Sequence, residues 1–230
     1  MKTIGLIGGM SWESSLEYYR TINKEVNARL GGLHSAECLL YSVDFAEIER
    51  MQSAGEWQEA GEQLGEVADK LQQAGADFIV ICTNTMHKVV EQIEEKISIP
   101  VLHIADTTAA EIGRRKLVKV GLLGTRYTME QDFYRSRIES HGIEVVVPVT
   151  TQRDEINRII FEELVAGDLR QTSKEFFQRA IRDMVAEGAE GIILGCTEIG
   201  LLIKPEDADI PLFDTAQIHA IQAVHRALEV

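Results

Sequence analysis

Two stretches of this chain repeat the same transition from strand to helix, and this repetition constrains the fold more than any other feature. The segments "ICTNTMHKVV" (residues 81–90) and "LGCTEIGLLI" (194–203) each pass from an apolar run through a short polar cluster into a helical pattern, and Thr83 falls on Cys196 when they are overlaid. Further matches join "IGLIGG" (4–9) to "VGLLGT" (120–125) and "ISIPVLHIADTTA" (97–109) to "ADIPLFDTAQIHA" (208–220). The three offsets, 113, 116 and 111 residues, indicate a duplicated unit of about half the chain.

Within each half, short apolar and β-branched runs alternate with helical patterns. The runs read TIGLIG, CLLYSV, DFIVIC and PVLHI in the first half, and KVGLLG, EVVVPV, GIILGC and IPLFDT in the second. Because such alternation is typical of parallel sheets covered by helices, we predict an α/β protein of two similar parallel-sheet, flavodoxin-like units related by pseudo-twofold symmetry. We expect residues 1–98 plus 209–230 to form the first unit and 99–208 the second, with the last strand and helix packing back on the first unit.

The charge and the cysteines limit the partners and the compartment. A formal net charge of −14 argues against binding to nucleic acid or to an anionic membrane surface, both of which require clustered Lys and Arg. The N-terminal segment lacks the pattern of a signal peptide, and no apolar run approaches the ~20 residues of a membrane span. Three scattered cysteines do not make a disulfide framework, so we expect a cytoplasmic protein with reduced thiols.

Thr83 and Cys196 each follow a predicted strand and precede a predicted helix. Ligands of open parallel sheets bind at the carboxyl ends of the strands, and helix starts favour anions there. If the halves face each other, these two side chains approach a bound molecule from opposite sides. That geometry suits proton transfer on the two faces of a planar carbanion, so we predict that the site lies between the units.

Four motifs make this sequence resemble the aspartate/glutamate racemase family. They are "GLIGGMSWESS" (5–15), "TNTMHK" (83–88), "GTRYTM" (124–129) and "GCTEIGLL" (195–202). The resemblance implies a racemase that uses no pyridoxal phosphate or metal, acts on small amino acids and forms a homodimer. In this family one cysteine from each half exchanges protons with the α-carbon. Cys196 matches the second cysteine, whereas Thr83 stands in place of the first.

These matches lead to the following site assignments. We expect Cys196 and Thr83 to be catalytic, with Cys196 removing the α-proton of the L-enantiomer as a thiolate favoured by the helix start, and Thr83 or a water acting on the opposite face. The expected substrate-binding residues are Met10, Gln52, Asn84, Thr85, Thr125, Thr197 and Glu198. Gln52 and Ala166 occupy places where aspartate racemases typically carry basic residues, so we expect weak selectivity for a dicarboxylate.

Each signal also has a simpler interpretation. Cys196 alone would more often be a buried structural cysteine, and Thr83, Asn84, Thr85 and Thr197 could be ordinary helix caps. The glycines of "GLIGGM" do not fit the dinucleotide-binding fingerprint, and the six histidines show no metal-ligand spacing. Two other functions stay open: a decarboxylase of the arylmalonate type that works with a single cysteine, and a catalytically weak carboxylate-binding protein.

Overall fold

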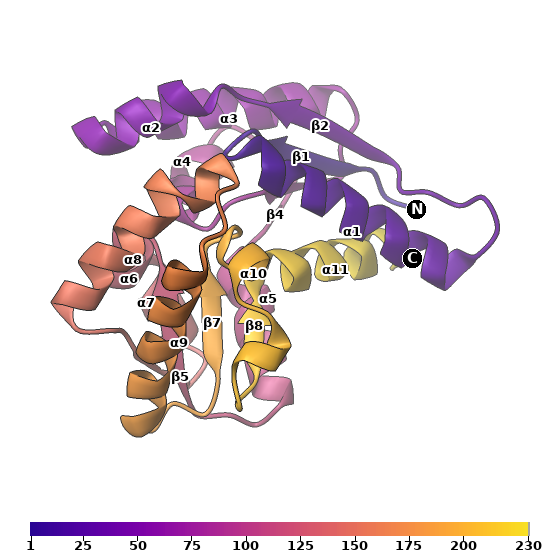
Figure 1. The fold of residues 1–230 in the computed structure, drawn as a ribbon. Coiled ribbons are helices and arrows are strands. Elements are labelled where there is room, and N and C mark those ends of the chain that lie inside the picture. Colours follow the sequence, from indigo (N-terminus) through magenta and orange to yellow (C-terminus); the bar gives the residue numbers. More distant parts are fainter. Residues whose placement is uncertain (230) are drawn as a thin grey trace. The chain divides into compact units, whose positions relative to one another are not determined.

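The computed structural model describes residues 1–229, which form two compact units (Figure 1). The first unit contains Met1–His103 together with the C-terminal residues from His219, and the second contains Ile104–Ile218. The second unit therefore extends about ten residues further than we expected from the sequence. The strand β8 (Leu212–Asp214) is the reason, because it pairs with β7 (Ile192–Gly195) in the second sheet rather than joining the first unit.

The first unit is built on a four-stranded parallel sheet with the order β2-β1-β3-β4. Its strands are β1 (Ile4–Gly8), β2 (Cys38–Ser42), β3 (Phe78–Ile81) and β4 (Val101–Leu102). Its helices are α1 (Trp12–Leu30), α2 (Phe45–Ala54), α3 (Trp57–Gln73), the 3₁₀ helix η1 (Thr85–Val89), α4 (Val90–Glu94) and the later part of α11 (Thr215–Leu228). Both central strands are buried along their whole length, as apolar runs without alternation predict.

Helices cover both faces of this sheet. On one face Ile7, Ile79 and Ile81 pack with apolar side chains of α2, α3 and α4 in a single buried cluster. On the other face the guanidinium of Arg226, on α11, lies over the ring of Phe78 at 5.4 Å. Burial on both sides accounts for the stability of the two central strands.

Gly9, which directly follows β1, makes the turn into α1. Gly9 has φ of +92°, a conformation that L side chains rarely adopt, and a Cβ there would meet the carbonyl oxygen of Val43 at 2.2 Å. Its amide donates to Ser15 Oγ (2.8 Å), and Ser15 Oγ donates to the carbonyl of Ser11 (2.9 Å). The motif "GLIGGM" is therefore explained by a tight turn onto a helix.

The second unit repeats the first. Its parallel sheet has the order β6-β5-β7-β8, with β5 (Lys119–Gly124) and β6 (Glu144–Val146) completing the four strands. Its helices are α5 (Ile104–Arg114), α6 (Arg126–Glu130), α7 (Asp132–Glu139), α8 (Thr150–Glu162), η2 (Leu164–Ala166), α9 (Gln171–Ala186), α10 (Ile199–Leu202) and η3 (Pro205–Asp207). The equivalent strand order in both sheets confirms two similar flavodoxin-like units.

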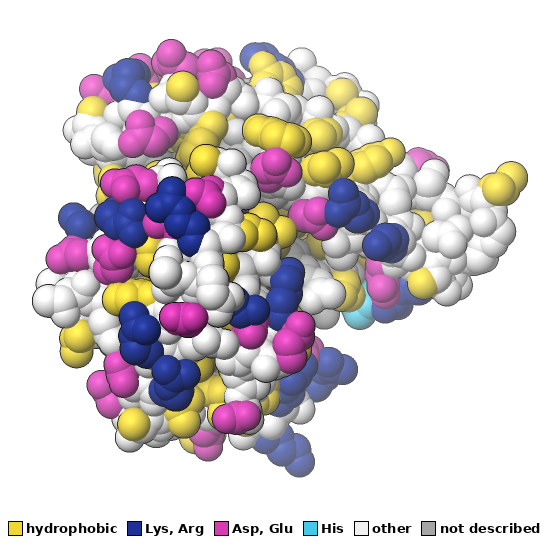
Figure 2. Space-filling model, in the orientation of Figure 1, with side chains coloured by type: hydrophobic (Ala, Val, Ile, Leu, Met, Phe, Trp, Pro, Cys, Tyr) yellow, Lys and Arg dark blue, Asp and Glu magenta, His cyan; other side chains and the backbone are white. Residues whose placement is uncertain are grey.

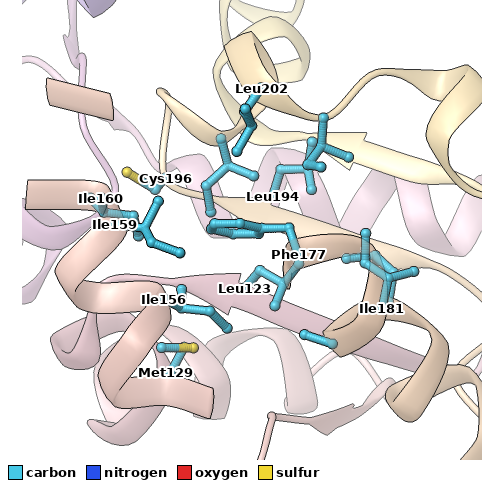
Figure 3. Close-up of a cluster of buried hydrophobic side chains, with 14 of the residues drawn as sticks. Leu123, Met129, Ile156, Ile159, Ile160, Phe177, Ile181, Leu194, Cys196 and Leu202 are labelled. Carbon is cyan, nitrogen blue, oxygen red and sulfur yellow. The ribbon is translucent and has the colours of Figure 1, made fainter. Parts of the chain in front are cut away.

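The second sheet is also covered on both faces. Leu123, Ile192 and Leu194 pack against α8, α9 and α10, whereas Val120, Leu122 and Ile193 pack against α5 and α7. Phe177 from α9 is fully buried in the first of these two clusters (Figure 3). Neighbouring residues of one strand thus point to opposite faces of the sheet, so the position of a residue along the strand decides on which face its side chain lies.

Candidate active site

The first half-site lies where β1 and β3 end, beside the point at which the strand order of the first sheet reverses. Thr83, two residues beyond β3, is half-buried, and the 3₁₀ helix η1 begins at Thr85. The Asn84 side chain makes no cap hydrogen bond at the start of this helix, although such capping was one interpretation of the sequence. Asn84 and Thr85 are both buried next to Thr83, so the structure brings these three predicted residues together.

A network of buried histidine side chains contacts this segment and stabilises it. The Nδ1–H of His87 donates to the carbonyl of Thr83 (2.8 Å), and its ring lies 4.5 Å from that of His103 and 5.8 Å from that of His219. His219 donates through Nε2 to the carbonyl of Leu102 (2.8 Å), which leaves Nδ1 to accept from the hydroxyl of Tyr18 (2.9 Å). Burial lowers the pKa of His219 to about 4, so this ring is neutral at pH 7.

This network is a part of the half-site that sequence reasoning missed. Tyr18 and His219 are 201 positions apart, and no local pattern joins them. The only signal in the sequence is the position of His87, four residues after Thr83 and therefore about one helical turn away.

Met10 and Gln52 are both buried in the first unit, as are Asn84 and Thr85. Met10 belongs to the buried cluster around Ile7, Ile48 and Met51. The amide nitrogen of Gln52 lies 2.9 Å from the sulfur of Met86, a weak acceptor. The Gln52 side chain carries a strong hydrogen-bonding group, whereas the Met10 side chain fills part of the core.

The second half-site lies where β5 and β7 end. Cys196 follows β7, is 8% exposed, and belongs to the hydrophobic cluster around Phe177, with its sulfur on the side turned away from that ring (Figure 3). The Sγ of Cys196 lies 3.0 Å from Glu198 Oε2, and the hydroxyl of Thr197 donates to the same oxygen at 2.7 Å. The three predicted residues of the "GCTE" motif therefore share one hydrogen-bonded group.

The electrostatics of this half-site differ from our expectation. Burial raises the pKa of the Cys196 thiol well above its usual range, and the carboxylate of Glu198 raises it further. Backbone amides of Glu198 and Ile199 lower the pKa, but they do not outweigh these causes. The prediction that the helix start would favour the thiolate near neutral pH is wrong for the resting protein, because burial of the sulfur and the carboxylate that lies against it outweigh the backbone amides of the helix start.

The other two cysteines are also protonated thiols, in surroundings that differ from those of Cys196. Cys82, next to Thr83, is fully buried, and burial raises the pKa of its thiol above the range that proteins use for bases. Its sulfur lies 3.9 Å from the carbonyl of Val80, on its own strand. Cys38 is half-buried on the edge strand β2, and burial raises its pKa as well.

Thr125 closes the other side of the second half-site. It is the N-cap of α6, its Oγ1 accepts from the amide of Thr128 (3.3 Å), and the two hydroxyls lie 3.1 Å apart. Gly124 and Gly195 are paired at the ends of β5 and β7, and a Cβ on Gly124 would meet the Thr128 side chain at 3.1 Å. Thr125 is therefore a helix cap, and a capping residue can still contact a ligand through its backbone.

The described residues offer neither a metal cluster nor a membrane-spanning helix. Among residues 1–229, no three His, Cys, Asp or Glu side chains are placed so that they could hold a metal ion. Across the same residues, none of the helices combines the length and the apolar character that crossing a membrane requires.

Several solved structures share the fold of this chain. The chain matches along its whole length, with a TM-score of 0.93 and 56% identity, the structure of a candidate Asp/Glu racemase from Yersinia pestis, which is also covered completely. An aspartate racemase homologue from Pyrococcus horikoshii gives a TM-score of 0.85 at 40% identity, again with both chains fully covered. Aspartate racemase from Picrophilus torridus shares the fold at 20% identity, with a TM-score of 0.80 over 99% of this chain and 94% of its own.

Curated relatives match over shorter stretches. The broad specificity amino-acid racemase RacX from Bacillus subtilis is 28% identical over 149 residues, which are 65% of this chain and 64% of that protein. A glutamate racemase from Streptococcus suis is 35% identical over 129 residues, 54% of this chain and 46% of its own length. The matches thus span about half to two thirds of these relatives. A model of the Asp/Glu/Hydantoin racemase family matches residues 7–223, and the chain therefore belongs to the Asp/Glu/Hydantoin racemase family.

Proposed function

We propose that the protein is a cofactor-independent racemase of small amino acids, aspartate and glutamate or a broader set. The observation that supports this most is the hydrogen-bonded group of Cys196, Thr197 and Glu198 at the end of β7, in a chain of the racemase family. A thiol in contact with a carboxylate is a pair that can hold and move one proton.

The first step of the proposed reaction uses this pair. Glu198 accepts the proton of the Cys196 thiol, and the resulting thiolate removes the α-proton of the L-enantiomer. The electron pair of the broken C–H bond passes into the substrate carboxylate, which becomes a planar enolate-like carbanion. Loss of charge at Glu198 on protonation relieves the repulsion that holds the pKa of Cys196 high.

The second step returns a proton to the opposite face of the carbanion. We assign it to Thr83 or to a water that Thr83 orients, since a threonine hydroxyl is too weak an acid to act readily alone. This assignment requires Thr83 and Cys196 to act on opposite faces of the α-carbon. Because a thiol and a hydroxyl group differ as proton donors, the maximal rates in the two directions should be unequal. The equilibrium constant between the two enantiomers stays at one.

The substrate carboxylates need donors rather than a metal in this proposal. Asn84, Thr85, Thr125 and Thr197 offer hydroxyl or amide groups close to the two reacting positions. Gln52 would contact the side-chain carboxylate without supplying a positive charge. A neutral donor binds a carboxylate less strongly than an arginine does, which fits broad rather than strict specificity.

A panel of L-amino acids tests this function directly. Chiral chromatography should detect the D-enantiomer from L-aspartate, L-glutamate or a related amino acid, and Cys196→Ala should abolish its formation. Cys38→Ala is the matched control, because Cys38 is a cysteine of the other unit. If no amino acid of the panel racemises although the protein is folded, the proposal is wrong.

One observation favours a second candidate, the arylmalonate type of decarboxylase. A decarboxylase of this type needs a protonated thiol, and the resting Cys196 is protonated in an apolar cluster. Release of carbon dioxide from phenylmalonate without racemisation of amino acids would support this alternative. Binding of L-glutamate with neither reaction would instead indicate a carboxylate-binding protein.

The proposal includes a cytoplasmic homodimer. Cys38, Cys82 and Cys196 are all free, which suits a reducing compartment. The homodimer is what the family resemblance implies for the assembled enzyme.

A further inference from the structure

The short helix α10 follows the proposed proton acceptor, Glu198, and depends on the rest of the second unit for its position. It has four residues, about one turn, and a helix of this length is not stable through its own hydrogen bonds. Glu198, its N-cap residue, makes no side-chain cap hydrogen bond and directs its carboxylate at the thiol of Cys196. The direction of that carboxylate therefore depends on the contacts that hold α10 in place.

One such contact comes from Asp214, at the end of the neighbouring strand β8. In the parallel pair of β7 and β8, Asp214 lies opposite Leu194, two residues before Cys196. A Cβ added to Gly200, the second residue of α10, would lie 2.4 Å from the Oδ2 of Asp214. The carboxylate thus packs directly against the backbone of α10, and the glycine makes this close approach possible.

Asp214 is itself held in position by hydrogen bonds. Its Oδ1 accepts from the amide of Gln217 (3.0 Å), the third residue of α11, as an N-capping side chain does. The next residue, Thr215, is fully buried and donates through its hydroxyl to the carbonyl of Leu194 (2.9 Å). Asp214 cannot turn away from Gly200 without losing its bond to α11, so it is a firm support for α10.

The duplication places a comparable contact in the first unit. There the ring of His87, four residues after Thr83, lies 4.5 Å from the ring of His103, which follows β4. In the overlay of the two halves, His87 falls on Gly200 and His103 falls on Asp214. The pairs β3–β4 and β7–β8 also have the same register. Each copy therefore packs a side chain from the end of its fourth strand against the segment that follows its reacting residue.

We propose that Asp214 is a positioning residue: by packing on the backbone of α10 at Gly200, it keeps the carboxylate of Glu198 directed at the proposed catalytic thiol. Surface charge does not supply this direction, because acidic and basic side chains are interspersed over the second unit on the face shown in Figure 2. The inference rests on the proposed function for the role of Glu198 as proton acceptor. The position of the Glu198 carboxylate can be tested without turnover.

The pH dependence of Cys196 alkylation supplies this test. In the Gly200→Ala variant the added methyl group displaces α10, so the carboxylate of Glu198 lies farther from the sulfur. The pH at which iodoacetamide alkylates Cys196 at half the maximal rate should then fall by about one unit, as measured by mass spectrometry of the Cys196 peptide. Gly113→Ala, on α5, is the matched control, because a Cβ there meets no atom within 4 Å.

Asp214→Ala changes the same contact from the other side. It removes the support of α10 without adding an atom, so it should also lower the midpoint of Cys196 alkylation. In the double variant the methyl group added at Gly200 occupies the space that the carboxylate leaves, and the midpoint should fall no further than in Asp214→Ala alone. In a Glu198→Gln background neither substitution should shift the midpoint, because no carboxylate is left to displace. A general loosening of the fold would shift it in that background too.

Racemisation provides the second measurement. Gly200→Ala should lower kcat roughly 10²-fold, because the proton acceptor is displaced from the thiol. Wild-type midpoints in both Gly200→Ala and Asp214→Ala, additive shifts in the double variant, or shifts that persist in the Glu198→Gln background would overturn the proposal. Circular dichroism checks that each variant is folded, and Asp214→Ala decides the question if Gly200→Ala does not fold. If the wild-type protein racemises no amino acid, the midpoints still report the contact, so the two failures are distinguishable.

Discussion

At the scale of single residues, the contact between Cys196 and Glu198 decides how the second half-site works. A carboxylate 3.0 Å from a buried sulfur disfavours the thiolate, so the resting residue is a thiol. The same carboxylate is the nearest group that can accept the thiol proton. Glu198 is therefore proposed to act on the proton of Cys196, in addition to the substrate-binding role that the sequence suggested.

The Glu198→Gln variant separates the effect of Glu198 on the pKa of Cys196 from its proposed role as the acceptor of the thiol proton. Removing the negative charge should lower the pKa of Cys196, because the thiolate no longer faces a like charge. The thiol should therefore react faster with iodoacetamide at pH 8, as measured by mass spectrometry of the Cys196 peptide. Racemisation should nevertheless fall by roughly 10²–10⁴-fold, since glutamine cannot accept the proton. A variant that gains both reactivity and turnover would show that Glu198 is not the acceptor.

Thr83→Cys tests the opposite face. A thiol has a pKa of ~8.5 and exchanges protons far more readily than a hydroxyl group, so activity starting from the D-enantiomer should rise, by roughly tenfold or more. Initial rates from D-glutamate and L-glutamate, measured separately, check this. Thr172→Cys, at an exposed position of α9, is the matched control. An unchanged rate from the D-enantiomer would count against the role of Thr83.

At the scale of elements, the duplication could be predicted from the sequence and the connections between distant elements could not. Apolar runs such as "DFIVIC" predicted strands correctly, because the central strands of a parallel sheet are buried on both faces and therefore have continuous apolar sequences. The short strand β8 was assigned to the wrong unit, because a three-residue strand carries no signal for its partner. Likewise, the thiol of Cys196 was expected to be acidic, since burial and the direction of the Glu198 side chain depend on tertiary structure.

The histidine network could not be predicted from the sequence either, and it leads to a prediction of its own. His219 joins α11 to α1 and to the end of β4 through two hydrogen bonds of a neutral ring. Its pKa of about 4 lies below the value of about 6.5 in an unfolded chain. Between these two values the unfolded state binds the proton and the folded state does not, so the free energy of unfolding decreases as the pH falls from 6.5 to 4.

His219→Gln should remove this pH dependence while keeping one donor and one acceptor. Going from pH 7 to pH 5, the wild-type protein should lose about 2 kcal/mol more free energy of unfolding than the variant. Urea unfolding at the two pH values measures the difference. His34→Gln, on the exposed loop after α1, is the control and should behave as the wild type does. Equal losses in the wild type and in His219→Gln would mean that His219 is protonated in the folded state.

At the scale of the whole molecule, the proposed reaction uses one residue from each of two similar units. Each unit ends its central strands in a polar cluster, around Thr83 in one and around Cys196 in the other. Neither cluster alone can both remove and return a proton on opposite faces of a carbanion. The duplication is thus proposed to have a chemical purpose, with the thiol–carboxylate pair retained in only one copy.

Exchange of the α-proton in heavy water tests this central claim most directly. Nuclear magnetic resonance should show the α-proton signal of L-aspartate or L-glutamate disappearing in the presence of the wild-type protein, at least as fast as the D-enantiomer accumulates. The Cys196→Ala variant should leave that signal unchanged. An α-proton that stays in place with the folded wild-type protein, or one that exchanges equally well without the sulfur of Cys196, would contradict the account.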